Sequence, residues 1–181
     1  PERPRLRRTG VNREQRAALD TAYAEFVRLG TPSLHHTAWL LTGSADAAGE
    51  LVQAALVKAY VVWPRIHDGQ SLAYTRRILV NVHHDSWRRR RREDVAEHVP
   101  ERPVTPPTVT EDRDELMGLL ATLSRHQRTV VVLRYYNDLP EAEVAELLGI
   151  SVGSVKSAAS RGLATLRAAH SDREQAERTL S

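Results

Sequence analysis

Apolar side chains in the first half of the chain recur every three to four positions, the spacing of one face of an α-helix. Gly30 followed by Pro32 predicts one helix end, and Pro64 predicts another, because proline cannot donate a backbone hydrogen bond inside a helix. Ser33 and Ser71 are suitable N-caps, since their hydroxyl groups can accept from the first turn. The pattern therefore predicts helices over 17–29, 33–43 and 47–63, and a long helix that starts at Ser71.

The second half continues with shorter helices that are bounded by capping signals. Leucines at helical spacing predict a helix that ends near Ser124, and Ser124 with Gln127 forms a capping box for a helix over 125–136. Pro140 is expected at the first position of the next helix, Gly149 at its C-cap and Ser151 at the N-cap of the last helix. Two helices joined by a short turn that contains glycine predict a helix-turn-helix.

A proline-rich stretch separates the two halves. Four prolines fall within eight residues between Pro100 and Pro107, and no helical or strand period crosses them. The sequence thus predicts an all-α fold of two small helical domains joined by an extended linker. The expected divisions are a basic N-terminal tail over 1–16, a first domain over 17–95, a linker over 96–112, a second domain over 113–170 and a C-terminal tail over 171–181.

The composition excludes several classes of protein and site. Hydrophobic residues make up 41% of the 181 residues, which is enough to bury a core. No apolar run approaches the ~18 residues of a membrane-spanning helix, so we expect no membrane insertion and a cytoplasmic location. The absence of cysteine excludes disulfides and thiolate metal sites. The pairs His35–His36 and His83–His84 would diverge by about 100° on a helix, so no metal site is expected, and no cofactor.

Positive charge is concentrated in two separate blocks. Residues 76–92 hold seven arginines against Asp85 alone, whereas residues 93–115 hold eight acids against two arginines. Residues 152–170 contain Lys156, Arg161 and Arg167 and no acid. Two basic blocks on either side of an acidic connector indicate two surfaces that meet a polyanion.

The two basic blocks suit different forms of nucleic acid. In a helix-turn-helix the second helix lies in the major groove, and Arg161 could bind guanine there while Lys156 holds a phosphate. The helix that starts at Ser71 instead combines arginines with Tyr74 and Trp87, and aromatic planes among cations suit unstacked bases. Each of these two aromatic side chains is equally consistent with a place in the core.

Several short motifs, in a fixed order, carry a resemblance to a known family. The first half has WLLTG at 39–43, ELVQ at 50–53, KAY at 58–60, and Arg77-Ile78 followed by Asn81 and Asp85. The second half has LRYY at 133–136, VAELLGIS at 144–151 and VGSVKS at 152–157. Over about residues 21–168 the chain resembles the extracytoplasmic-function group of sigma-70-type bacterial initiation factors.

The resemblance implies a promoter-specificity subunit of RNA polymerase that has no catalytic activity of its own. Its expected partners are core RNA polymerase, through the clamp and flap, promoter DNA, and an anti-sigma factor. The residues implied for the polymerase are Glu50, Leu51, Val52, Gln53, Leu56 and Lys58. Those for the separated −10 strand are Arg65, His67, Asp68, Arg76, Arg77, Asn81, His84, Asp85, Trp87 and Arg88, and those for the −35 duplex are Ser151, Gly153, Ser154, Lys156, Ser157, Ser160 and Arg161.

Some positions depart from the family pattern. Ala54 and Leu56 stand where the family usually has an acid and an aromatic residue, which removes one expected salt bridge to the clamp. Ala158 and Ala159 stand where Arg and Leu are frequent, so the preferred −35 sequence stays open.

Two other functions compete with this one. A helix-turn-helix regulator that binds duplex DNA without polymerase is the alternative, but it leaves the first half without a role. The G-x-S-x-G string at 149–153 would indicate a hydrolase only after a strand, and the sequence predicts a helix there.

Overall fold

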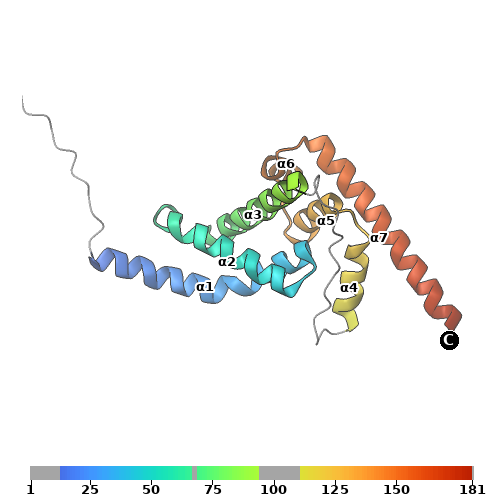
Figure 1. The fold of residues 1–181 in the computed structure, drawn as a ribbon, viewed down its shortest axis with the longest axis horizontal. Helices are drawn as coiled ribbons and strands as arrows, with labels where there is room; N and C mark the ends of the chain where they lie inside the picture. Colours follow the sequence, from blue (N-terminus) through green and yellow to red (C-terminus); the bar gives the residue numbers. More distant parts are fainter. Residues whose placement is uncertain (1–12, 67–68, 94–110, 181) are drawn as a thin grey trace, which may run out of the picture.

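The computed structural model describes residues 13–66, 69–93 and 111–180, and all regular elements in these ranges are helices (Figure 1). The prediction of an all-α fold is therefore confirmed for the described part of the chain. The first half contains α1 (Arg13–Thr42), α2 (Ala45–Val62), the short η1 (Trp63–Arg65) and α3 (Ser71–Glu93). The second half contains α4 (Glu111–Ala121), α5 (Arg125–Val131), η2 (Val132–Tyr136), α6 (Glu141–Leu148) and α7 (Val152–Leu180).

The prediction that a helix ends at Gly30 is wrong, because α1 runs without interruption through Gly30 and Pro32. Gly30 is buried, and a β-carbon there would lie 3.0 Å from the Phe26 ring and 3.6 Å from Leu72 of α3. The glycine thus allows close packing between helices and does not end one. Residues such as the fully buried Leu34 anchor the C-terminal part of α1 in the core. This tertiary packing outweighs the tendency of proline to interrupt a helix.

Helices α2 and α3 both pack against α1. The hydroxyl group of Ser44 accepts a hydrogen bond from the Ala47 backbone at 3.3 Å, so α2 starts two residues before the predicted position. Pro64 does stop α2, which passes into the single turn η1. The largest fully buried side chain of α3 is Leu79, next to the buried Val80.

The helix-turn-helix of the second half follows the predicted capping pattern closely. Ser124 and Gln127 form the capping box at the start of α5, Gly149 adopts φ +64° after α6, and Ser151 accepts from the Ser154 backbone at 3.1 Å. Pro140 is the N-cap of α6, one position before the predicted one. The predicted helix over 125–136 changes to a π-helix at Val132, and α7 continues to Leu180, through the segment predicted as a tail.

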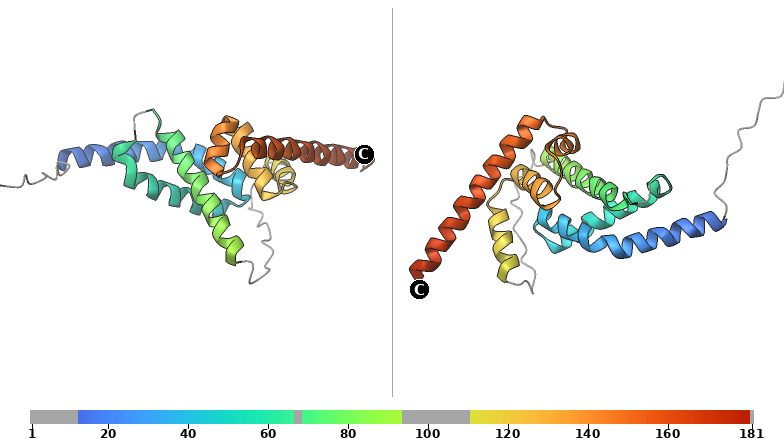
Figure 2. Two further views of the ribbon diagram at one scale, coloured as in Figure 1. Left: turned by 90° about the horizontal axis from the view of Figure 1, so that it is seen from above. Right: turned by 180° about the vertical axis from the view of Figure 1, so that it is seen from behind.

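The two halves pack directly against each other and share one hydrophobic core. Figures 1 and 2 show α6 beside α3, and α7 projecting away from the rest of the molecule toward its C-terminal end. The core joins Leu34 and Leu79 of the first half to Leu133 and Val144 of the second. The predicted linker falls almost entirely within residues 94–110, which lie outside the described residues. In the described ranges, no helix has the length and apolar character needed to cross a membrane.

Candidate nucleic-acid interface

The Leu-Val-Gln motif of α2, residues 51–53, is partly buried in the core and partly exposed at the surface. Leu51 and Val52 are buried, so they hold α2 on its neighbours and do not face a partner. Glu50, Gln53 and Lys58 are exposed. The buried pair corrects the expectation that the whole motif contacts the polymerase, and it follows from the 100° step between neighbouring helical residues. Leu56, also expected at the contact, is partly buried.

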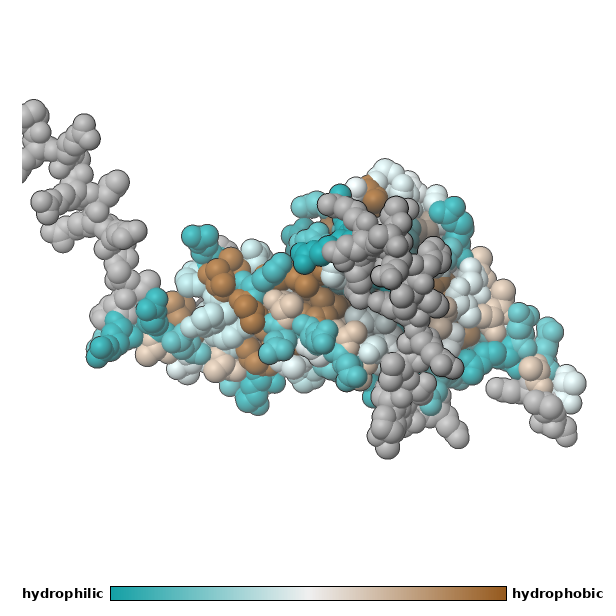
Figure 3. All heavy atoms as spheres, in the orientation of Figure 1, coloured by the Kyte–Doolittle hydropathy of each residue, from teal (hydrophilic) through white to brown (hydrophobic). Residues whose placement is uncertain are grey.

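An apolar surface lies next to these exposed polar residues. Apolar side chains gather on the visible face over α1 and α2 (Figure 3). The large exposed apolar residues of these helices include Leu29, Val57 and Val61, of which Val61 is 75% exposed. An exposed apolar patch of this kind is typical of a protein-protein contact. An aromatic cluster lies between α1 and η1, in which the centre of the Trp63 ring lies 5.0 Å from those of both Tyr23 and Phe26.

One face of α3 carries exposed polar and aromatic side chains at helical spacing. Tyr74 is 44% exposed, and Asn81, Asp85 and Arg88 follow it along the same face. The partly exposed Arg77 lies at the border of this stripe. Tyr74 is thus at the surface rather than in the core. Arg65 is exposed in η1, whereas His67, Asp68 and the side chain of Trp87 lie outside the described residues.

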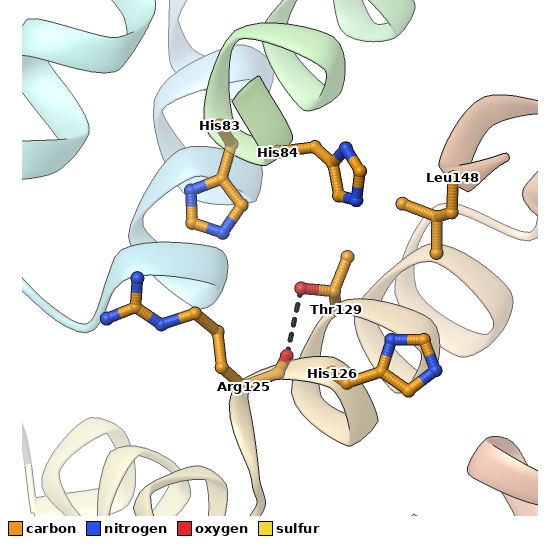
Figure 4. Close-up of a pocket in the computed structure, with 6 residues that line it drawn as sticks. All are labelled: His83, His84, Arg125, His126, Thr129 and Leu148. Carbon is orange, nitrogen blue, oxygen red and sulfur yellow. Dashed lines mark hydrogen bonds between the residues drawn. The ribbon is translucent and has the colours of Figure 1, made fainter. Parts of the chain in front are cut away.

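The neighbouring face of α3 meets the second half of the chain. His83 and His84 extend from α3 toward Thr129 of α5, and a small pocket forms between α3, α5 and Leu148 of α6 (Figure 4). Burial is the largest cause that lowers the pKa of His84, followed by the charge of Arg88. The charge of His126, across the pocket, also lowers the pKa of His84, whereas the charge of Asp85 raises it. The ring of His84 therefore favours its neutral form in this arrangement.

Helix α7 presents the expected donors to solvent along its first three turns. All seven residues implied for the −35 duplex are exposed, whereas Val155, Ala158 and Ala159 are buried against the rest of the second half. The Lys156 ammonium group lies 3.7 Å from the Glu141 carboxylate at the start of α6. The structure thus places Ser151, Gly153, Ser154, Lys156, Ser157, Ser160 and Arg161 together on one accessible side of the helix-turn-helix.

Arg128 joins the two halves by a contact that the sequence pattern did not predict. Its Nε donates to the carbonyl oxygen of Leu40 at 2.6 Å, and so it binds the C-terminal turn of α1, where a helix favours a cation. Burial, and then the charge of Arg125, lower the pKa of Arg128 to about 10, so the side chain stays charged at neutral pH. The two residues are 88 positions apart, and no local signal in the sequence relates them.

The sequence pattern did not predict several further contacts between the halves. The Asn137 amide donates to the Thr37 hydroxyl at 3.1 Å, and the His36 ring stacks on Tyr136 with centroids 4.9 Å apart. Burial is the largest cause that lowers the pKa of His36, followed by the charges of Arg113 and then His35. The guanidinium group of Arg113 also lies 4.5 Å from the centre of the Trp39 ring.

The basic α3 helix forms a separate ionic contact with α6. Arg77 lies 3.7 Å from a carboxylate oxygen of Glu143 and 3.4 Å from one of Glu146. The Arg76 side chain lies partly buried beside this contact, in a second small pocket that Leu139 and Leu147 help to line. The structure therefore brings the border of the α3 stripe into direct contact with the helix-turn-helix.

Comparisons with known proteins agree with this architecture. Residues 26–93 match the family model Sigma-70 region 2, and residues 113–166 match Sigma-70, region 4. The RNA polymerase sigma-E factor of Streptomyces coelicolor is 38% identical over 148 residues, which cover 80% of this chain and 84% of that protein. The ECF RNA polymerase sigma factor EcfG of Rhodopseudomonas palustris is 30% identical and covers 76% of this chain and 78% of its own length.

A solved structure has a similar fold. The sigma factor RpoE of Bartonella quintana, in complex with the anti-sigma factor NepR, superposes with a TM-score of 0.65 and 25% sequence identity. The superposition covers 81% of this chain and 95% of that one. These matches confirm the resemblance that the motifs indicated. The chain belongs to the extracytoplasmic-function group of the sigma-70 family and is an RNA polymerase sigma factor.

Proposed function

We propose that this sigma factor distributes promoter recognition over three helices. In this proposal α2 docks on the clamp of core RNA polymerase, α3 binds the separated −10 strand, and α7 binds the −35 element as duplex. The observation that carries it is the pair of donor-rich exposed faces, one on α3 and one on α7, on different halves of the chain. A regulator that binds only duplex DNA needs the second face alone.

The composition of the α7 face supports binding to duplex DNA. Lys156 and the exposed serines are hydrogen-bond donors of the kind that hold phosphates and set the position of a recognition helix. Arg161 is the long, forked donor of the set, and a bidentate contact to guanine contributes about 1–3 kcal/mol of discrimination. Ala158 is buried and cannot contact a base, so recognition by this part of α7 depends on the exposed residues around it.

The α3 face suits a strand whose bases are unstacked. The exposed ring of Tyr74 offers a plane for stacking, which contributes roughly 1–3 kcal/mol per base. Asn81 offers an amide that can bond to the edge of a base, and the exposed Arg88, about two turns further along α3, offers a cation for the backbone phosphates. His67, Asp68 and Trp87 are proposed for the same strand from the family resemblance alone.

The α2 face supplies the proposed contact with core polymerase. Glu50, Gln53 and Lys58 project from it beside the exposed Val57, and this mixture of apolar and charged groups is typical of a protein interface. An anti-sigma factor is a second proposed partner, because the similar RpoE structure was solved with NepR. Both proposed partners are proteins, and the chemistry of RNA synthesis belongs to the polymerase.

Reconstituted transcription tests this division of roles. Bacterial core RNA polymerase and the full chain are combined on promoter fragments selected by the holoenzyme, and run-off transcripts are measured. We expect Asn81→Ala to impair promoter opening while the closed complex still forms. Lys156→Ala is expected to weaken binding evenly across promoter sequences and to lower the slope of log K against log salt by about one unit.

Gln175→Ala on the distal part of α7 is the matched control for a loss of side-chain amide, because Gln175 is exposed and far along the helix from the proposed interface. It should leave both opening and salt dependence unchanged. Wild-type opening by Asn81→Ala would contradict the role of α3, and an unchanged salt slope for Lys156→Ala would contradict the role of α7.

A further inference from the structure

Lys156, which is proposed to hold a phosphate of the −35 duplex, has an anionic partner within the helix-turn-helix itself. Its ammonium nitrogen lies 3.7 Å from a carboxylate oxygen of Glu141, in the first turn of α6. The side chain of Lys156 is 64% exposed, and that of Glu141 is 34% exposed. An ion pair that is open to solvent is weak, so Lys156 can exchange this carboxylate for another anion.

The architecture of the motif places Glu141 beside the expected path of the DNA backbone. In a helix-turn-helix the first helix crosses the backbone while the second enters the major groove. Glu141 is the first residue of that first helix, α6. A carboxylate is favourable at the start of a helix because of the helix dipole, but it repels a phosphate that binds nearby. Glu141 therefore stabilises α6 and at the same time opposes its approach to DNA.

We propose that Glu141 sets the affinity of this sigma factor for the −35 duplex by competing with a DNA phosphate for Lys156. The inference rests on the proposed role of α7 in binding that duplex. Lys156 must leave Glu141 when it binds a phosphate, and the carboxylate then loses its cation beside the DNA. Glu141 is thus a positioning residue, which acts through Lys156 and does not itself contact DNA.

The competition affects one kind of contact and not the other. Arg161 is the second cation among the seven residues proposed for the −35 duplex, and it forms no ion pair with any acid in the described ranges. Phosphate contacts carry no sequence information, whereas a bidentate contact between arginine and guanine does. Glu141 therefore weakens a contact that is independent of sequence and leaves the proposed base contact of Arg161 unchanged.

Counterions provide a signature of this exchange. DNA releases about one cation for each phosphate that a protein cation neutralises. When Lys156 leaves Glu141, the freed carboxylate takes up a cation from solution, and this uptake offsets part of the release. Without the carboxylate, the fall of log K with log salt should become steeper by up to about one unit.

The test measures binding of the holoenzyme to a duplex fragment that contains the −35 element and ends upstream of the −10 element. Core RNA polymerase is combined with the full chain carrying Glu141→Gln, Lys156→Ala or both, and binding is titrated at several KCl concentrations. Glu174→Gln is the matched control, because it also removes one exposed carboxylate. Glu174 lies 3.9 Å from His170 in the distal part of α7, far along the helix from Lys156.

We expect Glu141→Gln to bind the fragment about two- to fivefold more tightly, since exposed ion pairs are individually weak. The salt dependence should steepen as described, and both effects should disappear in the Lys156→Ala background, where no competition exists. Thermal stability of Glu141→Gln should fall slightly, because the helix dipole loses a favourable anion. A merely structural role would therefore change binding in the opposite direction. Glu174→Gln should change neither affinity nor slope.

Unchanged or weaker binding by Glu141→Gln would overturn the inference. An equal gain with and without Lys156, or an equal gain in Glu174→Gln, would also overturn it, because the carboxylate would then act through its charge alone. The proposed role of α7 has its own readout. Wild-type affinity and slope in Lys156→Ala would refute that role and the inference with it, whereas a failure of Glu141→Gln alone refutes only the competition.

Discussion

Replacing Thr37 with valine tests whether the two halves pack together in solution, because the change removes one hydroxyl group at their contact. Thr37 is fully buried in α1, and its hydroxyl accepts from the Asn137 amide at 3.1 Å while it donates to the Ser33 carbonyl at 3.2 Å. Valine has nearly the same shape and the same branching at the β-carbon, so the change removes the polar group without opening a large cavity. The interaction joins residues 100 positions apart and exists only when the halves are packed.

The expected loss follows from what the substitution leaves behind. The Asn137 side chain is partly buried, and its carbonyl oxygen already lacks a hydrogen-bond partner among the described residues. Thr37→Val also removes the acceptor from its amide, and an unsatisfied buried donor costs about 1–3 kcal/mol. In a double-mutant cycle with Asn137→Ala, the coupling free energy should be about 0.5–1.5 kcal/mol, the net value of one neutral hydrogen bond.

Urea unfolding of the full chain measures these free energies. Thr31→Val is the control, because the Thr31 hydroxyl also bonds to a carbonyl oxygen one turn earlier in α1, that of Val27, and no contact with the second half is involved. It should cost less than about 0.5 kcal/mol. A coupling energy near zero between positions 37 and 137 would refute the packed arrangement in solution.

Other predictions concern glycines, titration and capping. Gly43→Ala should destabilise the fold more than Gly149→Ala in thermal unfolding. Both residues have positive φ, which costs an alanine about 1–2 kcal/mol, but only the β-carbon at Gly43 would lie 3.2 Å from a guanidinium nitrogen. The lowered pKa values of His36 and His84 mean that the packed state binds fewer protons. Its stability should therefore fall as the pH drops below about 6.5, in urea titrations at several pH values. Ser124→Ala should cost about 1 kcal/mol by removing the capping box of α5, again in urea unfolding.

Local sequence signals were sufficient where the structure depends on neighbouring residues. The turn of the helix-turn-helix was predicted because a glycine with positive φ and a serine N-cap act within a few positions of their own helix. The faces of α7 followed from the same logic, since burial of Val155 and exposure of Ser154 and Ser157 reflect helical periodicity. These features supplied most of the proposed −35 interface.

Predictions from the sequence are wrong where contacts between distant parts of the chain determine the structure. Gly30 and Pro32 indicated a helix end, but packing of α1 on α2 and α3 keeps it continuous. Leu51 and Val52 belong to a motif expected at a partner surface, yet the assembled helices bury them. The contact of Arg128 with α1 spans 88 positions, and a single sequence contains no period or cap that encodes such a pair.

Permanganate reactivity of promoter thymines is the most direct test of whether this chain opens the −10 element together with core polymerase. With core polymerase and the wild-type chain together, we expect thymines of the −10 element to react because their bases are unpaired, while the −35 element stays double-stranded and protected from nuclease. The chain alone should open no thymines. Tight protection of duplex DNA by the chain alone, with no additional reactivity when core polymerase is present, would contradict the account.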